Sequence, residues 1–186
     1  MKYYKKIVGK RVYLSPINPE DVEKYVEWLN DLELSLNLTM APKILSISKE
    51  KELLEDMSKE GYNFAIVSEN DDKLIGNCGL MDVELVHGTA ELGIFIGEKD
   101  YWDKGYGQEV INLILDYGFN LLNLNNIILR VHSFNKRAIN CYKKCGFKEI
   151  GRRRENFVIG DDKYDDIYMD ILAEEFEGSI PDILKD

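Results

Sequence analysis

The chain of 186 residues has few cysteines, few histidines and no long apolar run. No apolar segment reaches the roughly 18 residues that a membrane-spanning helix needs, so we expect no membrane partner. The basic start, Met1–Lys6, is not followed by the apolar stretch of a signal peptide, and we therefore expect a cytoplasmic protein. An odd number of cysteines without a secretion signal indicates free thiols.

Ligands for metals are scarce. The two histidines, His87 and His132, join no ligand cluster, so we expect no metal site. Cys141 and Cys145 are four residues apart on a predicted helix and share a face, but zinc needs more ligands than these two. We interpret both, together with Cys78, as small packing residues, because unpaired cysteine is commonly buried.

Positive charge is in deficit, with 24 Lys and Arg against 34 Asp and Glu and a net charge of −10. Because phosphate contacts need Lys and Arg, we expect no nucleic-acid partner. The acidic balance favours the approach of cationic molecules, amines included, mainly through the association rate, although it also serves solubility alone. The length and the hydrophobic fraction of 45% predict one globular domain over residues 1–186, with its core at about 10–173.

The apolar pattern predicts strands and helices in sequence. Strands are expected at 11–14, 63–68, 73–81, 89–97, 126–132, 147–159 and 163–172; helices are expected from Asn18 to Leu29 and at 48–59, 105–122 and 135–145. The stretch from Asn30 to Ile47 is predicted to be irregular. Two β-α-β connections among hairpins indicate the α/β class in a layered α+β form: a mixed, mostly antiparallel central sheet flanked by helices on both faces.

The segment Trp102–Gln108 joins the strand at 89–97 to the helix that follows. Gly105 and Gly107 allow positive φ and leave no side chain to block a phosphate, and a helix N-terminus attracts anions. Glu109, one turn into the helix, does not help an anion, although it favours the helix dipole. Such a turn is by itself also typical of an ordinary strand-to-helix connection. It lacks the Gly-Lys-Ser/Thr of a P-loop and the third glycine of a dinucleotide site.

Further segments accompany this turn in a specific order and spacing: Trp28–Asp31, Ala90–Gly93, Asn135–Ala138, Tyr142–Phe147 and Tyr164–Tyr168. Together with the turn they resemble N-acetyltransferases of the GNAT superfamily, in particular the branch of ribosomal-protein N-terminal (Rim-type) and polyamine acetyltransferases. The resemblance covers about residues 11–172. It departs from the general pattern at Trp102, where the superfamily has Gln or Arg but this branch has Trp.

The resemblance implies an enzyme that transfers an acetyl group from acetyl-CoA, its co-substrate, to a primary amine by direct attack in a ternary complex. No metal is implied. The side chains and backbone that the resemblance assigns to coenzyme A are Ile94, Phe95 and Ile96 beside the pantetheine arm, Trp102, Asp103, Lys104, Gly105, Tyr106, Gly107 and Gln108 at the pyrophosphate, and Asn135, Ala138 and Tyr142. A homodimer is an expectation at the family level.

Two residues are implied to be catalytic. Glu91 is an acid within an apolar strand and would be the general base, because an amine with a pKa near 10.4 is neutral only about 0.04% of the time at pH 7. A partly buried carboxylate with a raised pKa could accept that proton, directly or through a water. Tyr142 would protonate the departing thiolate. A solvated or arginine-paired Glu91, a core Tyr142 and a helix-capping Asn135 are the structural alternatives.

The residues implied on the amine side are Trp28, Asn30, Asp31, Glu91, Tyr164 and Asp166. Asp166 and the neighbouring Asp165 are equally typical of a surface turn. The acceptor itself stays open among a ribosomal-protein N-terminus, a polyamine, an amino sugar, an aminoglycoside and an amino acid, and charge slightly favours polyamines. A non-catalytic acyl-CoA sensor or partner domain is the alternative function, and a purely structural interaction protein is a weaker one.

Overall fold

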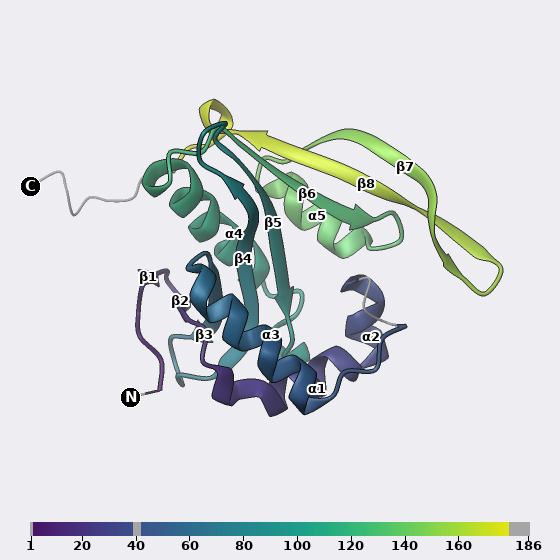
Figure 1. Cartoon of the computed structure of the whole chain (residues 1–186). Helices are drawn as coiled ribbons and strands as arrows, with labels where there is room; N and C mark the ends of the chain where they lie inside the picture. The colour runs from purple at the N-terminus through teal and green to yellow at the C-terminus, as the bar shows by residue number, and fades with distance from the viewer. Residues whose placement is uncertain (1, 39–41, 179–186) are drawn as a thin grey trace, which may run out of the picture. The chain divides into compact units, whose positions relative to one another are not determined.

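The computed structural model describes residues 2–38 and 42–178 (Figure 1). The chain divides into two compact units: unit 1 comprises Met1–Gly79 and Ile94–Val110, and unit 2 comprises Leu80–Gly93 and Ile111–Asp186. Eight strands are hydrogen-bonded in the order β1-β2-β3-β4-β5-β6-β8-β7. The pair β5/β6 is parallel, whereas β1/β2, β2/β3, β3/β4, β6/β8 and β7/β8 are antiparallel. The predicted class, a mixed and mostly antiparallel sheet with helices, is confirmed.

Unit 1 contains the first strands and the helices that follow them. Its strands are β1 (Ile7–Val8), β2 (Val12–Pro16), β3 (Asn63–Ser68), the first part of β4 (Leu74–Glu84) and the end of β5 (Thr89–Ile96). Its helices are η1 (Pro19–Asp21), α1 (Val22–Asn30), α2 (Leu32–Ser35), η2 (Leu36–Leu38), α3 (Ile47–Glu60), η3 (Lys99–Tyr101) and the start of α4 (Tyr106–Asp116). One core cluster of buried residues draws on β2, α1, α2, α3, β3 and β4, and Tyr13, Tyr25 and Leu54 are among its members.

The sequence places the ends of α3 through local chemistry. The Ser46 hydroxyl accepts a hydrogen bond from the Lys49 N–H (3.3 Å), which satisfies a donor that the first helical turn leaves free. Gly61 has a φ of +83° and closes the helix, a backbone conformation that glycine adopts without strain. The helix therefore begins slightly earlier than the pattern predicts, because the capping serine lies upstream of the apolar stripe.

The segment from Asn30 to Ile47 is not irregular throughout, which corrects the sequence-based expectation. Asp31 accepts a hydrogen bond from the Glu33 N–H (2.9 Å) and caps the short helix α2. Leu34 then turns into the core, where it is 4% exposed. The leucines of this segment alternate with polar residues, a period of two that conceals helical turns. The expected irregular segment includes residues 39–41, which lie outside the described residues.

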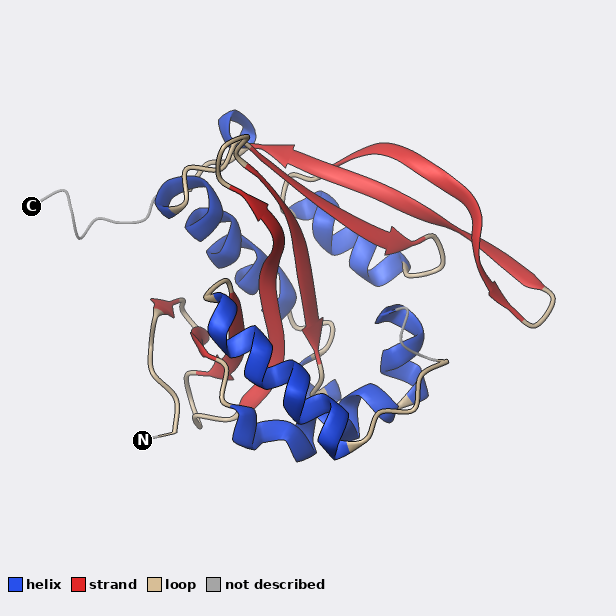
Figure 2. Cartoon of the chain, viewed as in Figure 1, coloured by secondary structure: helices blue, strands red, loops and turns tan. Residues whose placement is uncertain are grey.

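Unit 2 carries the later strands and α5. Its elements are the end of β4, the start of β5, the end of α4, η4 (Tyr117–Leu121), β6 (Asn126–His132), α5 (Lys136–Lys144), β7 (Lys148–Ile159), β8 (Asp162–Leu172) and η5 (Ala173–Glu175). The register of β5 with β6 runs from Thr89↔Asn126 to Glu91↔Ile128. Strands β7 and β8 form a long, twisted hairpin (Figure 2). The β5-α4-β6 connection is the parallel β-α-β unit that the sequence predicts.

Alternation along β6 divides the sheet of unit 2 into two chemically different faces. Ile127, Leu129 and Val131 are buried on one face, and Ile171 of β8 joins them beside Gly146, the residue that ends α5 with a φ of +97°. The opposite face of β6 carries Arg130 and His132, because successive strand residues point to opposite sides. The ionisable residues of β6 therefore lie on one face of the strand, which we call the polar face of unit 2. None of the described helices is long and apolar enough to cross a membrane.

Candidate active site

The turn after β5 is built from two left-handed residues. Asp103 has a φ of +57° and Gly105 a φ of +81°, whereas Gly107 lies inside α4 and is not among the positive-φ residues described. The sequence thus predicts one of the two positions with positive φ, Gly105, and misses the other, Asp103. Aspartate is a residue type that tolerates this conformation. The first helical backbone bond runs from the Glu109 N–H to the Gly105 oxygen (3.2 Å).

The amino end of α4 consequently presents backbone donors. N–H groups in the first turn of a helix have no intrahelical acceptor, and those of Tyr106 and Gly107 belong to this turn. Trp102, at the start of the turn, bonds back to the strand: its indole Nε1–H donates to the Ile96 oxygen (2.7 Å). The turn and the strand end are therefore fixed to one another within unit 1. Asp103, Lys104 and Gly105 are exposed, while Trp102, Tyr106 and Gln108 are half-buried.

The last residues of β5 are apolar and yet half-exposed. Ile94, Phe95 and Ile96 all keep partial solvent contact. Phe95 lies edge-on to the rings of Tyr25 and Trp28, with centroid separations of 6.2 and 6.0 Å, so one face of the strand end is packed. By the alternation of a strand, Ile94 and Ile96 point to the other face. An apolar strand end of this kind suits a ligand that is itself partly apolar and extended.

Three residues that are predicted to contact the amine form hydrogen bonds or ion pairs with other residues of unit 1. Trp28 is 4% exposed, and its Nε1–H donates to Glu98 (3.0 Å). The Asn30 amide donates to the Val26 and Leu45 oxygens (2.9 Å each) and thereby ties α1 to the segment before α3. The Asp31 carboxylate caps α2 and pairs with Lys99 (2.7 Å). Direct contact of these residues with an amine stays a prediction.

Glu98, directly after the glycine that follows β5, is the centre of a charged cluster that the sequence does not reveal. Its carboxylate pairs with Lys24 (2.6 Å) and with Lys73 and accepts the Trp28 N–H bond. Burial alone would raise the pKa of Glu98, but the hydrogen bonds from Lys24, Lys73 and Trp28 outweigh it and lower the pKa to about 2. Glu98 is therefore ionised at neutral pH and links α1, the start of β4 and the end of β5.

In unit 2, Glu91 lies half-buried on β5 at the last residue that is paired with β6. It pairs with Ile128, and residues directly paired across strands point to the same face. Two and four residues further along β6, Arg130 and His132 follow on that face. The predicted base thus stands at one end of the polar face of unit 2, and its role stays a prediction.

Helix α5 carries the predicted acid. The Asn135 side chain accepts a hydrogen bond from the Ala138 N–H (3.1 Å), so Asn135 caps the helix whatever else it contacts. Tyr142, two turns later, is half-buried, and its ring lies edge-on to Phe147 at 5.9 Å. Burial raises the pKa of the Tyr142 phenol, which keeps the hydroxyl protonated at neutral pH. A protonated phenol can donate to a thiolate.

Asp166 is fully buried, which distinguishes it from the surface turn acid that the sequence also allows. Its carboxylate bonds to Nδ1 of His132 (2.7 Å) and accepts a hydrogen bond from the Asn156 amide. The His132 ring stacks on Phe134 and on Phe157, at centroid separations of 5.3 and 4.2 Å, and the two phenylalanine rings also contact each other at 5.8 Å. Tyr164 packs edge-on to Phe134 at 4.9 Å. The two predicted amine-side residues of β8 thus belong to one aromatic and polar cluster.

Sequence reasoning misses His132, Arg11 and Glu98. Strand alternation places His132 on the polar side with Arg130, and this signal could have linked it to Asp166. Arg11 and Glu98 contact partners that lie far away in the sequence, and no local pattern indicates them. Among the described residues, no group of three or more His, Cys, Asp or Glu is arranged to hold a metal ion.

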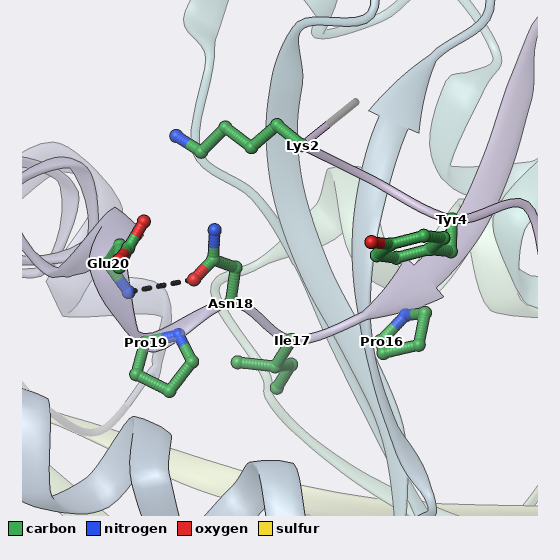
Figure 3. A pocket seen from close by; sticks show the side chains of 7 residues that line it. All are labelled: Lys2, Tyr4, Pro16, Ile17, Asn18, Pro19 and Glu20. Carbon is green, nitrogen blue, oxygen red and sulfur yellow. Dashed lines mark hydrogen bonds between the residues drawn. The ribbon is translucent and has the colours of Figure 1, made fainter.

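A surface pocket lies elsewhere in unit 1. It is lined by Lys2, Tyr4, Pro16, Ile17, Asn18, Pro19 and Glu20 (Figure 3). The Asn18 side chain is already committed to the Glu20 N–H (3.0 Å), as the dashed line in Figure 3 shows. None of the predicted site residues lines this pocket, and its few polar groups do not converge on one point.

Comparison with known proteins supplies the family context. Residues 11–148 match the family described as acetyltransferase (GNAT) domain. An uncharacterized N-acetyltransferase p20 of Bacillus licheniformis is 28% identical over 175 residues, which cover 91% of this chain and 97% of the relative. The spermidine N(1)-acetyltransferase of Vibrio cholerae is 36% identical over 102 residues, or 55% of this chain and 58% of the relative.

Solved structures agree with these matches. The spermidine N-acetyltransferase of Vibrio cholerae, in complex with CoA and spermine, has a TM-score of 0.79 and 28% sequence identity, with 89% of this chain and 97% of that chain covered. A GNAT-family acetyltransferase from Bacillus anthracis has a TM-score of 0.78 at 22% identity, with 91% and 99% covered, a likeness that supports the fold alone.

Proposed function

Since this chain belongs to the GNAT acetyltransferase family and is an acetyl-CoA-dependent N-acetyltransferase, we propose that it acetylates a cationic primary amine of the polyamine class. The amine would attack the thioester directly in a ternary complex, without a covalent enzyme intermediate. The observation that supports the coenzyme A part of this proposal is the turn after β5, where a half-exposed apolar strand end leads into two left-handed residues and a helix N-terminus.

This turn suits coenzyme A in two ways. The N–H groups at the start of α4 and the positive end of the helix dipole favour the pyrophosphate. The half-exposed Ile94 and Ile96 suit the pantetheine arm, which would bind along the strand as an added strand does. Asn135 and Ala138 at the start of α5 are proposed as further coenzyme contacts.

Proton transfer is assigned to unit 2. Glu91 would take a proton from the ammonium, because only the neutral amine attacks a carbonyl carbon. Backbone N–H groups at the end of β5 would polarise the thioester carbonyl. Tyr142 would donate a hydrogen bond to the departing sulfur and give it the hydroxyl proton. The chain needs no metal in this scheme.

The choice of a polyamine rests on relatives and on charge. Relatives named spermidine N(1)-acetyltransferase match this chain in Vibrio cholerae and, at 28% identity over 165 residues, in Escherichia coli. The net charge of −10 favours cationic acceptors. Trp28, Asn30 and Asp31 would shape the wall on which the amine lies, while Tyr164 and Asp166 would contribute through the cluster around His132.

The test titrates the purified protein with acetyl-CoA in a calorimeter and then follows thiol release with a panel of amines. We expect binding and amine-dependent thiol release that is highest with polyamines. In Tyr142→Phe, kcat should fall by roughly 10²–10⁴-fold while acetyl-CoA binding persists, which is the usual contribution of a general acid. Tyr4→Phe is the matched control, because Tyr4 is 65% exposed and removed from the proposed chemistry.

Three other outcomes would revise the proposal. Binding of acetyl-CoA without turnover on any amine would favour a sensor domain. Turnover only on an amino sugar, an aminoglycoside or a peptide N-terminus would replace the polyamine class. An unchanged kcat in Tyr142→Phe would remove Tyr142 from the reaction.

A further inference from the structure

The carboxylate of Glu109 lies where an anion site should have no acid. It is one turn into α4, beside the N–H groups that are proposed to bind the pyrophosphate. Burial alone would raise the pKa of Glu109, but hydrogen bonds from Arg11 and Lys10 lower it below its usual value, so the group is ionised. An ionised carboxylate without a partner would repel a phosphate bound at this end of the helix.

Glu109 is instead fully engaged by the turn between β1 and β2. Its Oε1 accepts the backbone N–H bonds of Lys10 (2.7 Å) and Arg11 (2.8 Å), and its Oε2 accepts the Arg11 Nε–H bond (2.8 Å). The Glu109 side chain is only 14% exposed. The negative charge is therefore neutralised locally, and α4 is fastened to a segment almost one hundred residues earlier in the chain.

Arg11 continues from Glu109 onto three consecutive residues of the glycine turn. Its Nη1–H donates to the Lys104 oxygen (2.8 Å), and its guanidinium lies over the Tyr106 ring, 4.4 Å from the centroid. The third residue is Gly105: a Cβ atom added to this glycine would lie 3.5 Å from Nη2 of Arg11. The planar guanidinium can stack on a ring and donate at its edge at once, which a lysine ammonium cannot do.

The Lys104 carbonyl is the critical partner. Lys104 stands between the two left-handed residues, Asp103 and Gly105. The orientation of its peptide group therefore decides whether the turn directs a carbonyl oxygen or N–H groups toward a bound anion. A carbonyl oxygen that faced a phosphate would repel it, and the bond to Arg11 directs this oxygen to the guanidinium. The contact therefore removes an acceptor from the anion side of the turn and holds the peptide between the two left-handed residues in one orientation.

We propose that Arg11 is a positioning residue for coenzyme binding: with Glu109 it forms a latch that fixes the Lys104–Tyr106 turn in its anion-binding conformation. The inference rests on the proposed function, since it concerns the same pyrophosphate site. Arg11 does not itself contact the reacting atoms. Its removal should affect the affinity for coenzyme A and leave the chemical step intact.

The experiment measures the Kd of coenzyme A by calorimetry and the steady-state constants of Arg11→Gln, Arg11→Lys and wild type. We expect Arg11→Gln to raise the Kd of coenzyme A and the KM of acetyl-CoA by about tenfold, the equivalent of one lost charge-assisted hydrogen bond. The kcat at saturation and the KM of the amine should change little. Arg11→Lys should be only partly better, because a lysine cannot stack on Tyr106 while it bonds to both Glu109 and the Lys104 oxygen.

A second substitution separates positioning from simple stability. In Arg11→Gln the Glu109 carboxylate keeps its bonds to the Lys10 and Arg11 backbone N–H groups but loses the guanidinium that neutralises its charge. Adding Glu109→Gln removes the uncompensated charge and should therefore lower the Kd of coenzyme A again, although it restores no bond to the turn. A purely structural role would give no such recovery. Arg152→Gln is the matched control, because Arg152 is similarly exposed and pairs with Glu149, but touches no part of the turn.

Several results would overturn the latch. These are an unchanged Kd in Arg11→Gln, a fall in kcat with an unchanged KM, or a double variant that binds coenzyme A no more tightly than Arg11→Gln. If Arg11→Gln does not fold, Arg11→Lys provides the same comparison with the charge retained. A wild-type protein that does not bind coenzyme A would instead refute the proposed function.

Discussion

Gly97 directly follows β5 and lies against the indole ring of Trp28. A Cβ at this position would overlap three atoms of that ring, which is itself boxed in by Tyr25 and Phe95. Because Trp28 is buried and bonded to Glu98, the ring cannot easily move away. We expect Gly97→Ala to lower the free energy of unfolding by about 1–3 kcal/mol, the usual cost of overpacking, and the melting temperature by several degrees.

Gly151 is the matched control for this substitution. It is a glycine in β7 with nothing within 4 Å of an added Cβ, and like Gly97 it has no positive φ in the structure. Gly151→Ala should leave the melting temperature unchanged or raise it slightly, because it restricts only the unfolded chain. Equal melting temperatures for the two variants would show that Trp28 accommodates the extra methyl group.

At the scale of single residues, the sequence predicts local backbone roles better than it predicts which side chains are buried. The glycine turn and the Asn135 cap follow from local chemistry and could be predicted. The pattern could not show that Trp28 turns into the core, because an aromatic residue at a helix end suits either a ligand wall or a packed interior. The same limit applies to Asp166, whose burial depends on His132, 34 residues away.

The link formed by Glu98 belongs to the scale of elements, since it joins α1, β4 and the end of β5. The folded-state pKa of about 2 lies below the usual value of 4.5. A depressed pKa means that the carboxylate contributes stability above about pH 4.5, and that this contribution is lost as the pH falls toward about 2. Glu98→Gln should cost about 2 kcal/mol at neutral pH, the scale of a hydrogen bond between charged groups.

Urea unfolding at about pH 7 and about pH 3 checks this, because the difference between wild type and Glu98→Gln should shrink at the lower pH. Glu52→Gln, an exposed change on α3, controls for the general effect of removing one negative charge. A difference that stays constant with pH would mean that the Glu98 carboxylate is not the group that stabilises the cluster.

Among the elements, those with a clear period and clear boundaries were predictable. Strands β3 and β6 match the predicted bounds because compact apolar runs end at turn residues. Helix α2 was missed because its leucines follow a period of two, and β1 because two residues carry no pattern. The latch between Arg11 and Glu109 was unpredictable for another reason: its partners are 98 residues apart.

The charge of the whole molecule acts on whatever approaches it. With a net charge of −10, the protein should attract a polyamine more strongly than a monoamine of similar length, because each further ammonium group adds to the attraction. Salt screens this attraction, since the Debye length shrinks from about 10 Å at 0.1 M to about 3 Å at 1 M. We therefore expect kcat/KM for a polyamine to fall by several-fold over this range, with little change for the monoamine.

The measurement compares the kcat/KM values of the two amines within one salt series. Salt acts equally on acetyl-CoA and on the fold in both series, so only the additional charge of the acceptor can separate them. The kcat at saturating amine should stay nearly constant, because screening acts on encounter and binding. Parallel salt curves for polyamine and monoamine would mean that the acidic residues serve solubility, and the choice of a polyamine would then have to rest on the similarity to spermidine N(1)-acetyltransferases alone.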